Sequence, residues 1–264
     1  MSDTLAVNEV FLSLQGESTF VGWPCVFVRL TACPLRCSYC DTAYAFTEGR
    51  RMSLAEVRRE INRLAAPFTN PTTGLGESRG NSTSVFGLRS SALHVRLPLV
   101  ELTGGEPLLQ TNALPLMRAL CDDGFTVLLE TSGALDIASV DPRVHRIMDL
   151  KCPSSGEVGR NRSENLEDLR STDEVKFVIG TREDYAWAKT QLVIHRLAEL
   201  CPVLFSWAMP LLPQQRDPSL KPMPAGQHPI SRQDLAEQIL ADGLPVRFQV
   251  QMHKVIWAPD QKGV

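Results

Sequence analysis

The chain contains the stretch Thr31-Ala-Cys-Pro-Leu-Arg-Cys-Ser-Tyr-Cys-Asp-Thr42, from which both its fold and its chemistry can be inferred. Cys33, Cys37 and Cys40 are spaced Cys-x3-Cys-x2-Cys, so three thiolates from one loop can converge on a single inorganic cluster. A four-iron cluster that is held by three cysteines keeps one iron open to a small molecule. The spacing therefore predicts an iron–sulfur cluster with an open coordination position.

Two other interpretations of these cysteines stay open at the level of sequence. A structural zinc site needs a fourth protein ligand to complete its tetrahedron, and the loop itself contains none. Cys25, Cys121, Cys152 or His94 could supply that ligand only if the fold brings one of them close. Free cysteines are also often buried as small hydrophobic side chains, so the three could simply pack in a core.

The composition is that of an ordinary globular protein, with 43% hydrophobic and 22% charged residues in 264. A net charge of -3 without a cluster of Lys and Arg argues against a nucleic-acid partner. The sequence has no basic start followed by an apolar run and no 18 consecutive apolar residues, so we expect a cytoplasmic protein without a membrane partner. Seven cysteines, an odd number, suit a reducing compartment better than a disulfide framework.

Apolar runs alternate with helical patterns along most of the chain. The apolar runs predict strands at residues 25–31, 93–102, 126–130, 144–150, 174–179 and 203–208. Helical spacing and capping boxes predict helices at about 53–66, 111–123, 162–170, 182–199 and 231–242. Six βα units imply a mostly parallel sheet with right-handed crossovers, short of the eight units of a closed barrel. We therefore predict an α/β fold, an incomplete TIM-like barrel, in a single domain over 1–264.

Three segments depart from this alternation. Residues 67–92 are rich in Gly, Ser, Thr, Asn and Pro without a period, which predicts a surface insertion or, alternatively, a lid. Residues 210–229 are rich in proline and are expected to form a loop. Residues 245–254 alternate strictly between apolar and polar, which predicts a strand. Its polar face is either solvated or, at the rim of an incomplete barrel, turned toward a site.

Unusual polar residues fall where the predicted strands end. The second strand ends in Thr103-Gly-Gly-Glu-Pro107, the third in Glu130-Thr-Ser-Gly133 and the fourth in Asp149-Leu-Lys151. A short strand at 8–14 likewise leads into the turn Gln15-Gly-Glu17. Active sites of barrel enzymes lie at the carboxyl ends of the strands, so we expect these residues and the cysteine loop to share one site.

Arg29 interrupts the apolar strand 25–31. A buried guanidinium needs an anionic partner, because an unpaired charge in an apolar environment is costly. An internal salt bridge and an anionic ligand both satisfy that need, and the residues alone leave the two alternatives open.

Taken together, these motifs resemble those of the 7-carboxy-7-deazaguanine synthases, a family of radical S-adenosylmethionine (SAM) enzymes in queuosine precursor biosynthesis. The motifs occur in the order of that family and span nearly the whole chain: Leu14-Gln-Gly-Glu17, Arg29, the cysteine loop with Asp41-Thr42, Thr103–Pro107, Glu130–Gly133, Asp149–Pro153 and Gln251–Lys254. The cysteine spacing and Gly-Gly-Glu-Pro are shared by many radical SAM enzymes. The Leu-Gln-Gly-Glu and Cys-Asp-Thr segments narrow the resemblance to this family.

The resemblance implies a lyase that converts 6-carboxy-5,6,7,8-tetrahydropterin into 7-carboxy-7-deazaguanine and ammonia. It implies a 4Fe-4S cluster, SAM used catalytically, and Mg²⁺. In such enzymes a 5'-deoxyadenosyl radical takes a hydrogen atom from C6 of the pterin, the ring contracts, and the hydrogen is returned. It further implies a homodimer and a flavodoxin-type electron donor.

The resemblance also assigns roles to individual residues. The cluster would be held by Cys33, Cys37 and Cys40, and Mg²⁺ by Thr42. The SAM contacts would be Ser38, Tyr39, Cys40, Gly105, Glu106, Ser132, Asp149, Leu150 and Lys151. The substrate contacts would be Leu14, Gln15, Gly16, Glu17, Arg29 and Thr103. On this basis the pterin carboxylate becomes the expected partner of Arg29. The chain continues from Lys254 to Val264, so the substrate contact made by the last residue of some relatives is not assigned to Val264.

Two competing functions share some of these features. A radical SAM activase, which makes a glycyl radical on a partner protein, has the same cysteine spacing and a small barrel. A metal-binding interaction module without turnover would need only the cysteines. Gln15 and Arg29, which suit a small anionic substrate, favour the synthase over the activase. Redox-silent zinc in the purified protein, without SAM binding, would support the interaction module instead.

Overall fold

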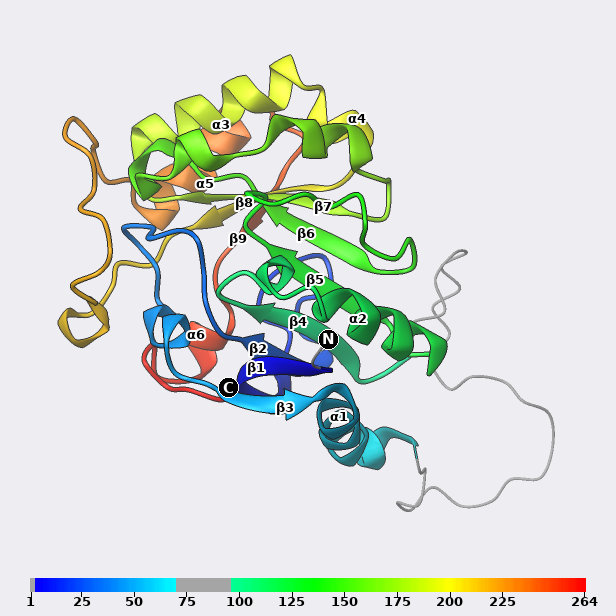
Figure 1. Ribbon diagram of the computed structural model, residues 1–264. Helices are drawn as coiled ribbons and strands as arrows, with labels where there is room; N and C mark the ends of the chain where they lie inside the picture. The colour runs from blue at the N-terminus through cyan, green and yellow to red at the C-terminus, as the bar shows by residue number, and fades with distance from the viewer. Residues whose placement is uncertain (1–2, 70–95) are drawn as a thin grey trace, which may run out of the picture.

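The computed structural model describes residues 3–69 and 96–264, and one open sheet of nine strands is the framework of this part of the chain (Figure 1). The strands are β1 (Thr4–Leu14), β2 (Pro24–Leu30), β3 (Arg50–Ser53), β4 (Leu99–Gly104), β5 (Val127–Thr131), β6 (His145–Asp149), β7 (Glu174–Ile179), β8 (Val203–Trp207) and β9 (Arg247–Gln249). Their order is β3-β1-β2-β4-β5-β6-β7-β8-β9. From β2 through β9 neighbouring strands pair in parallel, whereas β1 pairs antiparallel with β2 and β3. This open parallel sheet confirms the predicted incomplete barrel.

Helices cover the outer face of the sheet in two groups, α1 with α2 and α3 with α5 (Figure 1). The α-helices are α1 (Leu54–Thr69), α2 (Ala113–Asp122), α3 (Arg182–Ile194), α4 (Leu197–Leu200), α5 (Arg232–Ala241) and α6 (His253–Ile256). Short 3-10 helices are η1 (Ala43–Phe46), η2 (Pro107–Leu109), η3 (Pro153–Ser155), η4 (Val158–Arg160), η5 (Ser163–Asp168) and η6 (Pro213–Gln215). No helix among the described residues is long and apolar enough to cross a membrane.

The helices begin where the sequence provides capping side chains. Before α1, the Ser53 amide donates to Glu56 at 2.7 Å and the Glu56 amide donates to Ser53 Oγ at 3.2 Å. Thr181 and Asp184 form the same reciprocal pair at the start of α3. Each cap satisfies backbone N–H groups that a helix end leaves without partners, typically contributing about 1 kcal/mol. These local signals explain why the main helix starts were predictable.

The inner face of the sheet carries a separate apolar layer. Its buried members are Cys25, Leu99, Leu128 and Ile147, and the half-buried Phe20, Phe27 and Leu97 pack against it. Because side chains alternate along a strand, the next inward positions on β4 and β5 are Glu101 and Glu130. The barrel interior is therefore apolar at its base and carries acidic side chains one layer higher.

The loop between β1 and β2 crosses to the far side of the sheet. The Ser18 amide donates to Gln249 Oε1 of β9 at 3.1 Å, and Gln249 Nε2 donates back to the Ser18 carbonyl at 2.6 Å. The Thr19 amide donates to both carboxylate oxygens of Glu174 on β7, at 3.1 and 3.0 Å. This loop thus connects the two ends of the open sheet through side chains.

Several predicted boundaries differ from the structure. The expected strand at 245–254 is limited to Arg247–Gln249, because the chain then turns into α6. The expected helix at 162–170 is the 3-10 helix η5, and strand β3 was not predicted. Helix α1 continues through Pro67 to Thr69, so the segment expected as an insertion begins inside a helix, and its remainder lies outside the described residues. Residues 210–229 contain only η6 and turns, apart from a bridge at Pro229.

Candidate active site

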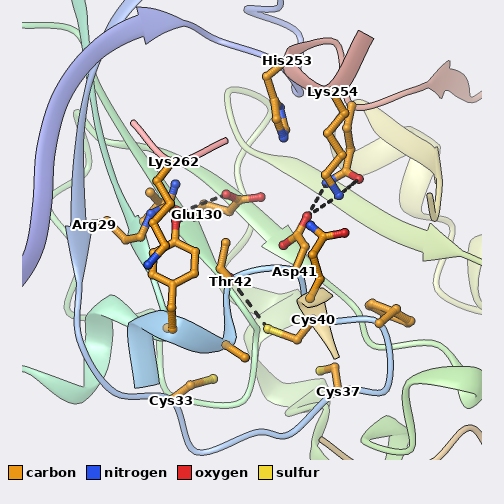
Figure 2. Close-up of a pocket in the computed structure, with 18 of the residues that line it drawn as sticks. Arg29, Cys33, Cys37, Cys40, Asp41, Thr42, Glu130, His253, Lys254 and Lys262 are labelled. Carbon is orange, nitrogen blue, oxygen red and sulfur yellow. Dashed lines mark hydrogen bonds and ion pairs between the residues drawn. The ribbon is translucent and has the colours of Figure 1, made fainter. Parts of the chain in front are cut away.

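A cavity of about 690 Å³ lies at the carboxyl ends of the parallel strands (Figure 2). The cysteine loop, the ends of β2, β4, β5 and β6, and the C-terminal segment all contribute to its lining. The predicted site residues that line it are Leu14, Gln15, Gly16, Glu17, Arg29, Cys33, Cys37, Tyr39, Cys40, Thr42, Thr103, Gly105, Ser132, Asp149 and Lys151. Three others, Ser38, Glu106 and Leu150, do not line it.

Three free thiols of the cysteine loop face one part of this cavity. Figure 2 shows the side chains of Cys33, Cys37 and Cys40 directed into the same space. Burial raises the pKa of the Cys37 thiol to about 12, although Lys151 acts in the opposite direction. A four-iron cluster binds each cysteine at a different iron, so three separated thiols at one opening fit such a cluster.

The other cysteines do not complete a zinc site with these three. Cys25 lies in the apolar layer of the barrel interior, and the Cys152 thiol donates to the Leu150 carbonyl, at 3.9 Å. Cys121 lies on α2, outside the cavity. The described residues include no group of three or more His, Cys, Asp or Glu side chains that could hold a single metal ion. The donor set therefore favours a cluster over a closed zinc site.

Two glycines position the cysteine loop against the end of β4. A Cβ atom on Gly104, whose φ is +129°, would lie 2.2 Å from the Leu30 carbonyl oxygen. A Cβ on Gly105 would lie 2.0 Å from the Ala32 carbonyl oxygen. The Gly105 and Glu106 amides donate to these two carbonyls at 3.1 and 2.8 Å. The Gly-Gly pair thus lets two backbones meet directly beside Cys33.

Glu106 supports the site from behind instead of lining it. It is fully buried, and its carboxylate accepts hydrogen bonds from the Thr131 hydroxyl at 3.0 Å and the Ser132 amide at 2.7 Å. It also accepts from the Leu108 amide at 3.1 Å, so it caps η2. These bonds hold the end of β5, where Ser132 faces the cavity.

Asp149 and Lys151 form an ion pair in the cavity that leaves one oxygen of Asp149 without a hydrogen bond among the described residues. Lys151 Nζ lies 2.7 Å from Asp149 Oδ2. Asp149 Oδ1 and the Tyr39 hydroxyl are buried without a hydrogen-bond partner among the described residues. Buried polar atoms are normally paired, so these two groups fit a polar ligand at this position, as the SAM contacts implied by the resemblance require.

Arg29 forms an internal salt bridge, which is one of the two alternatives left open by the sequence. Its Nε donates to Glu9 Oε1 at 2.7 Å, and the Tyr44 hydroxyl donates to the same oxygen at 3.0 Å. Its guanidinium also lies 5.7 Å from the centre of the Phe11 ring. Within the described part of the chain, the hydrogen bond to Glu9 is the one that the Arg29 side chain makes, and it uses the Nε edge. Arg29 also lines the cavity, so its two terminal nitrogens are available to an anion.

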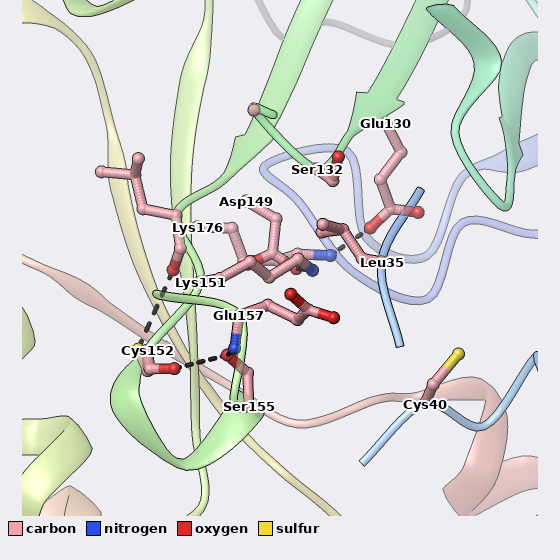
Figure 3. Close-up of polar contacts among 12 residues, drawn as sticks. Leu35, Cys40, Glu130, Ser132, Asp149, Lys151, Cys152, Ser155, Glu157 and Lys176 are labelled. Atoms are coloured by element: carbon pink, nitrogen blue, oxygen red, sulfur yellow. Dashed lines mark hydrogen bonds and ion pairs between the residues drawn. The ribbon is translucent and has the colours of Figure 1, made fainter. Parts of the chain in front are cut away.

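Sequence reasoning missed a buried charge cluster at the centre of the cavity. Lys176 Nζ forms an ion pair with Glu17 Oε2, at 3.1 Å. It forms a second ion pair with Glu130, which Figure 3 shows. Burial opposes the charge of Lys176, but Glu130 and Glu17 raise its pKa well above the usual value. Glu101 lies beside them, and burial together with the Glu130 carboxylate raises its pKa to about 8. The rule that singled out Arg29, a charge inside an apolar strand, also applies to Glu101 and Lys176 and would have found both.

The C-terminal segment closes the cavity opposite the sheet. Helix α6 lies beside the chain that follows the cysteine loop (Figure 1), where Lys254 Nζ is 2.5 Å from Asp41 Oδ2. Burial acts to raise the pKa of Asp41, but Lys254 lowers it to about 2. Gln251 Nε2 donates to Glu17 Oε1 at 3.1 Å and to Asp41 Oδ2 at 3.2 Å. Gln251 and His253 of the segment 245–254 therefore line the site, whereas Arg247 is exposed and lies outside it.

The Gly16 position leaves room for a further side chain of this segment. A Cβ on Gly16 would lie 2.5 Å from His253 Nδ1. His253 and residues 259–264 line the cavity, including Val264. Sequence reasoning quoted Gln251–Lys254 as a motif but assigned its residues no roles.

Comparison with known proteins gives a consistent family. No family model matches the chain. A 7-carboxy-7-deazaguanine synthase of Koribacter versatilis is 41% identical, over 98% of this chain and 100% of the relative. Another, of Chlorobaculum tepidum, is 38% identical, over 98% of this chain and 97% of the relative.

Solved structures agree on the fold. The crystal structure of QueE from Escherichia coli matches with a TM-score of 0.63 and 20% identity, over 95% of each chain. That of Streptococcus suis SuiB bound to S-adenosylmethionine matches with a TM-score of 0.53 and 11% identity, over 83% of this chain and 48% of SuiB. Because the sequence relatives exceed 30% identity over almost the whole length, this chain belongs to the 7-carboxy-7-deazaguanine synthase family.

Proposed function

We propose that this protein converts 6-carboxy-5,6,7,8-tetrahydropterin into 7-carboxy-7-deazaguanine and ammonia. The observation that carries the proposal is that three free thiols and the open edge of Arg29 share one cavity at the carboxyl ends of the strands. Residues 259–264 line the same cavity, which leaves room for a small molecule and disfavours a partner-protein loop of the kind that an activase binds. Family membership supports the same conclusion.

In this proposal Cys33, Cys37 and Cys40 would hold a 4Fe-4S cluster. When bound, the reduced cluster and SAM supply the radical that starts the reaction. The unpartnered Asp149 Oδ1 and Tyr39 hydroxyl support SAM binding beside the thiols, together with Gly105 and Ser132 on the neighbouring strand ends. Ser38, Glu106 and Leu150 would support the SAM site without lining the cavity. Ser38 Oγ, for example, donates to the Ser154 carbonyl at 2.6 Å and fixes the cysteine loop.

The substrate carboxylate is proposed to bind Arg29. Glu9 holds the Nε edge and orients the guanidinium, so the two terminal nitrogens can form a bidentate pair with a carboxylate. Thr103 Oγ1 donates to Glu130 Oε2 at 3.0 Å and fixes one carboxylate above the apolar layer. That layer excludes water from the base of the cavity, and Lys176 holds Glu17 and Glu130 in place through two ion pairs.

Three further features belong to the proposal. Mg²⁺ would bind near the Thr42 hydroxyl as a hard ion with oxygen ligands. The neighbouring Asp41 is already paired with Lys254, so it is not free as a further ligand in this arrangement. A homodimer and a flavodoxin-type electron donor follow from the resemblance and not from any contact in the described part of the chain.

The test is an anaerobic incubation of reconstituted protein with dithionite, SAM and 6-carboxytetrahydropterin, with product detected by mass spectrometry. We expect deazaguanine carboxylate, ammonia, and SAM that survives many turnovers. Cys37→Ser should lose iron, sulfide and activity together, whereas Cys121→Ser on α2 should retain all three. Cleavage of SAM by the wild type without formation of product would contradict the substrate assignment and favour a protein partner instead.

A further inference from the structure

Glu101 lies on the floor of the cavity, directly above the apolar layer. It is 2% exposed, lines the cavity and follows Leu99 at the next inward position of β4. None of the roles assigned above uses it. Its side chain accepts a hydrogen bond from Gln15 Nε2, which is 2.6 Å from Glu101 Oε2.

The other contact of the Gln15 side chain shows which group is the donor in its hydrogen bond with Glu101. The Glu17 amide donates to Gln15 Oε1 at 2.5 Å, and a backbone amide can only donate. Gln15 Nε2 is therefore the donor toward Glu101, and Glu101 Oε2 is the acceptor. Glu101 Oε1 has no hydrogen-bond partner among the residues that the structure describes and is not sealed off from the cavity.

The charges around Glu101 leave it without a counter-ion of its own. Glu17 from the β1–β2 loop, Glu130 from β5 and Lys176 from β7 surround it, and the thiol of Cys25 lies below on β2. Lys176 pairs with Glu17 and Glu130 and has no ion pair with Glu101. Burial, reinforced by Glu130, raises the pKa of Glu101 to about 8. At neutral pH its carboxyl group is therefore mostly protonated, with Oε1 as the site for the proton.

A protonated carboxyl group offers one O–H donor beside one carbonyl acceptor. That pair complements a lactam, in which a C=O acceptor stands next to an N–H donor. The oxo and N3–H groups of a pterin form such an edge, at the end of the fused ring remote from the 6-carboxylate. The strand register places Arg29 and Glu101 at different depths in the cavity. On β2 and β4, Arg29 lies opposite Thr103 and Phe27 lies opposite Glu101. Arg29 is therefore two residues, or about 7 Å, nearer the carboxyl ends of the strands than Glu101.

We propose that Glu101 is a specificity-determining residue that binds the lactam edge of the pterin through its Oε1 hydroxyl and Oε2 carbonyl, with Gln15 as its positioning residue. This inference rests on the proposed function. The substrate would then be held at both ends, by Arg29 at its carboxylate near the rim and by Glu101 at its ring edge on the floor. A ring without an acceptor beside its N–H would leave the buried hydroxyl unpaired and bind more weakly.

The test measures the KM and kcat for 6-carboxytetrahydropterin against pH in the wild type, Glu101→Gln and Glu101→Leu, with Glu167→Gln as a control on the exposed part of η5. The wild-type KM should be flat below about pH 7 and rise above about pH 8, as the Glu101 hydroxyl ionises. Glu101→Leu should raise KM at least about tenfold with a smaller change in kcat, because a donor and an acceptor are lost. Glu101→Gln keeps a donor and an acceptor, so it should raise KM less and remove the alkaline rise, which Glu167→Gln should retain.

Two results would overturn this inference while the proposed function stands. If product forms and Glu101→Gln is impaired as strongly as Glu101→Leu, the ionised carboxylate is the acting form. If neither variant changes KM, Glu101 does not contact the ring. Because Glu101→Leu could fold poorly, its melting temperature and its cleavage of SAM without pterin are measured in parallel, and the pH profile of Glu101→Gln decides the question without it. A wild type that forms no product from the pterin would overturn the proposed function together with the inference.

Discussion

Replacement of Lys176 by Met should destabilise the protein strongly and in a pH-dependent way. The Lys176 side chain is 4% exposed and pairs with Glu17 and Glu130. Removing one partner of a buried ion pair leaves uncompensated charge and typically costs about 3–5 kcal/mol. For a chain of this size each kcal/mol lowers the melting temperature by about 2–4 °C, so we expect a decrease of about 6–20 °C.

The exposed pair Lys189–Asp242 provides a matched control. Its atoms are 2.7 Å apart, but the Lys189 side chain is 44% exposed. Exposed pairs contribute at most about 1 kcal/mol, so Lys189→Met should lower the melting temperature by no more than about 4 °C. Both variants are melted anaerobically as reconstituted proteins and followed by circular dichroism.

The pH dependence gives the sharper test. The raised pKa of Lys176 means that its stabilising charge is fully present below its unfolded value and is lost only as pH rises through its folded value, so it stays charged between pH 5 and 8. The pKa of Glu17 is lowered by Lys176 and His253 against the effect of burial, so its contribution is lost as pH falls through that value. The deficit of Lys176→Met should therefore be large at about pH 8 and smaller at about pH 5, because Glu17 has lost the cation that lowers its pKa and takes up a proton more readily.

Lys176 does not stabilise the protein through its ion pairs if Lys176→Met melts like Lys189→Met, or if the loss of stability in Lys176→Met grows as pH falls. Adding Glu130→Gln to Lys176→Met should restore part of the lost stability, because it removes one of the two charges left unpaired. A purely additive double variant would mean that Lys176 acts through packing and not through charge.

Three other substitutions test the assignments of the site. Arg29→Ala should raise the pterin KM by about 10- to 150-fold through loss of charged hydrogen bonds while SAM cleavage persists, and an equal loss of both would make Arg29 structural. Thr42→Ala should change the Mg²⁺ dependence of turnover, so an unaltered Mg²⁺ titration would remove Thr42 from the metal site. Gly105→Ala should lower the iron and sulfide content, because its Cβ would lie 2.0 Å from the Ala32 carbonyl oxygen, whereas Gly159→Ala, with nothing within 4 Å, should bind iron normally.

Much of the fold could be predicted because its signals are local. The apolar run 174–179 and the capping box of Thr181 each lie within a few residues, and the structure has β7 and α3 there. Strand β3 was missed because Arg50-Arg-Met-Ser53 contains a single apolar residue, Met52, and pairs with β1 only through the tertiary fold. The segment after Gln249 was predicted as strand because apolar and polar residues do alternate there. In the structure Gln251 hydrogen-bonds Glu17 in the site, and β9 ends at Gln249.

The site was predictable as a set of motifs but not as a network. The sequence marks Arg29 as needing a partner, but it cannot select Glu9, which becomes a neighbour only through the pairing of β1 with β2. The same holds for Glu101 and Lys176, which belong to strands 75 positions apart in the chain, since 176 − 101 = 75. Which charges meet inside a barrel is decided by strand order and register, and neither is encoded in a local pattern.

The crossing of the β1–β2 loop has a mechanical consequence. A complete barrel is closed by a continuous backbone ladder, and its diameter is fixed by strand number and stagger. Here the β1–β2 loop is linked to β9 and β7, on the other side of the sheet, by side-chain hydrogen bonds instead, between Ser18 and Gln249 and between Thr19 and Glu174. The same loop begins with Gln15 and Glu17, which line the pocket. One loop therefore both limits how far the sheet curls and supplies part of the pocket wall. We therefore expect changes in this loop to alter the width of the pocket without shifting the register of any strand.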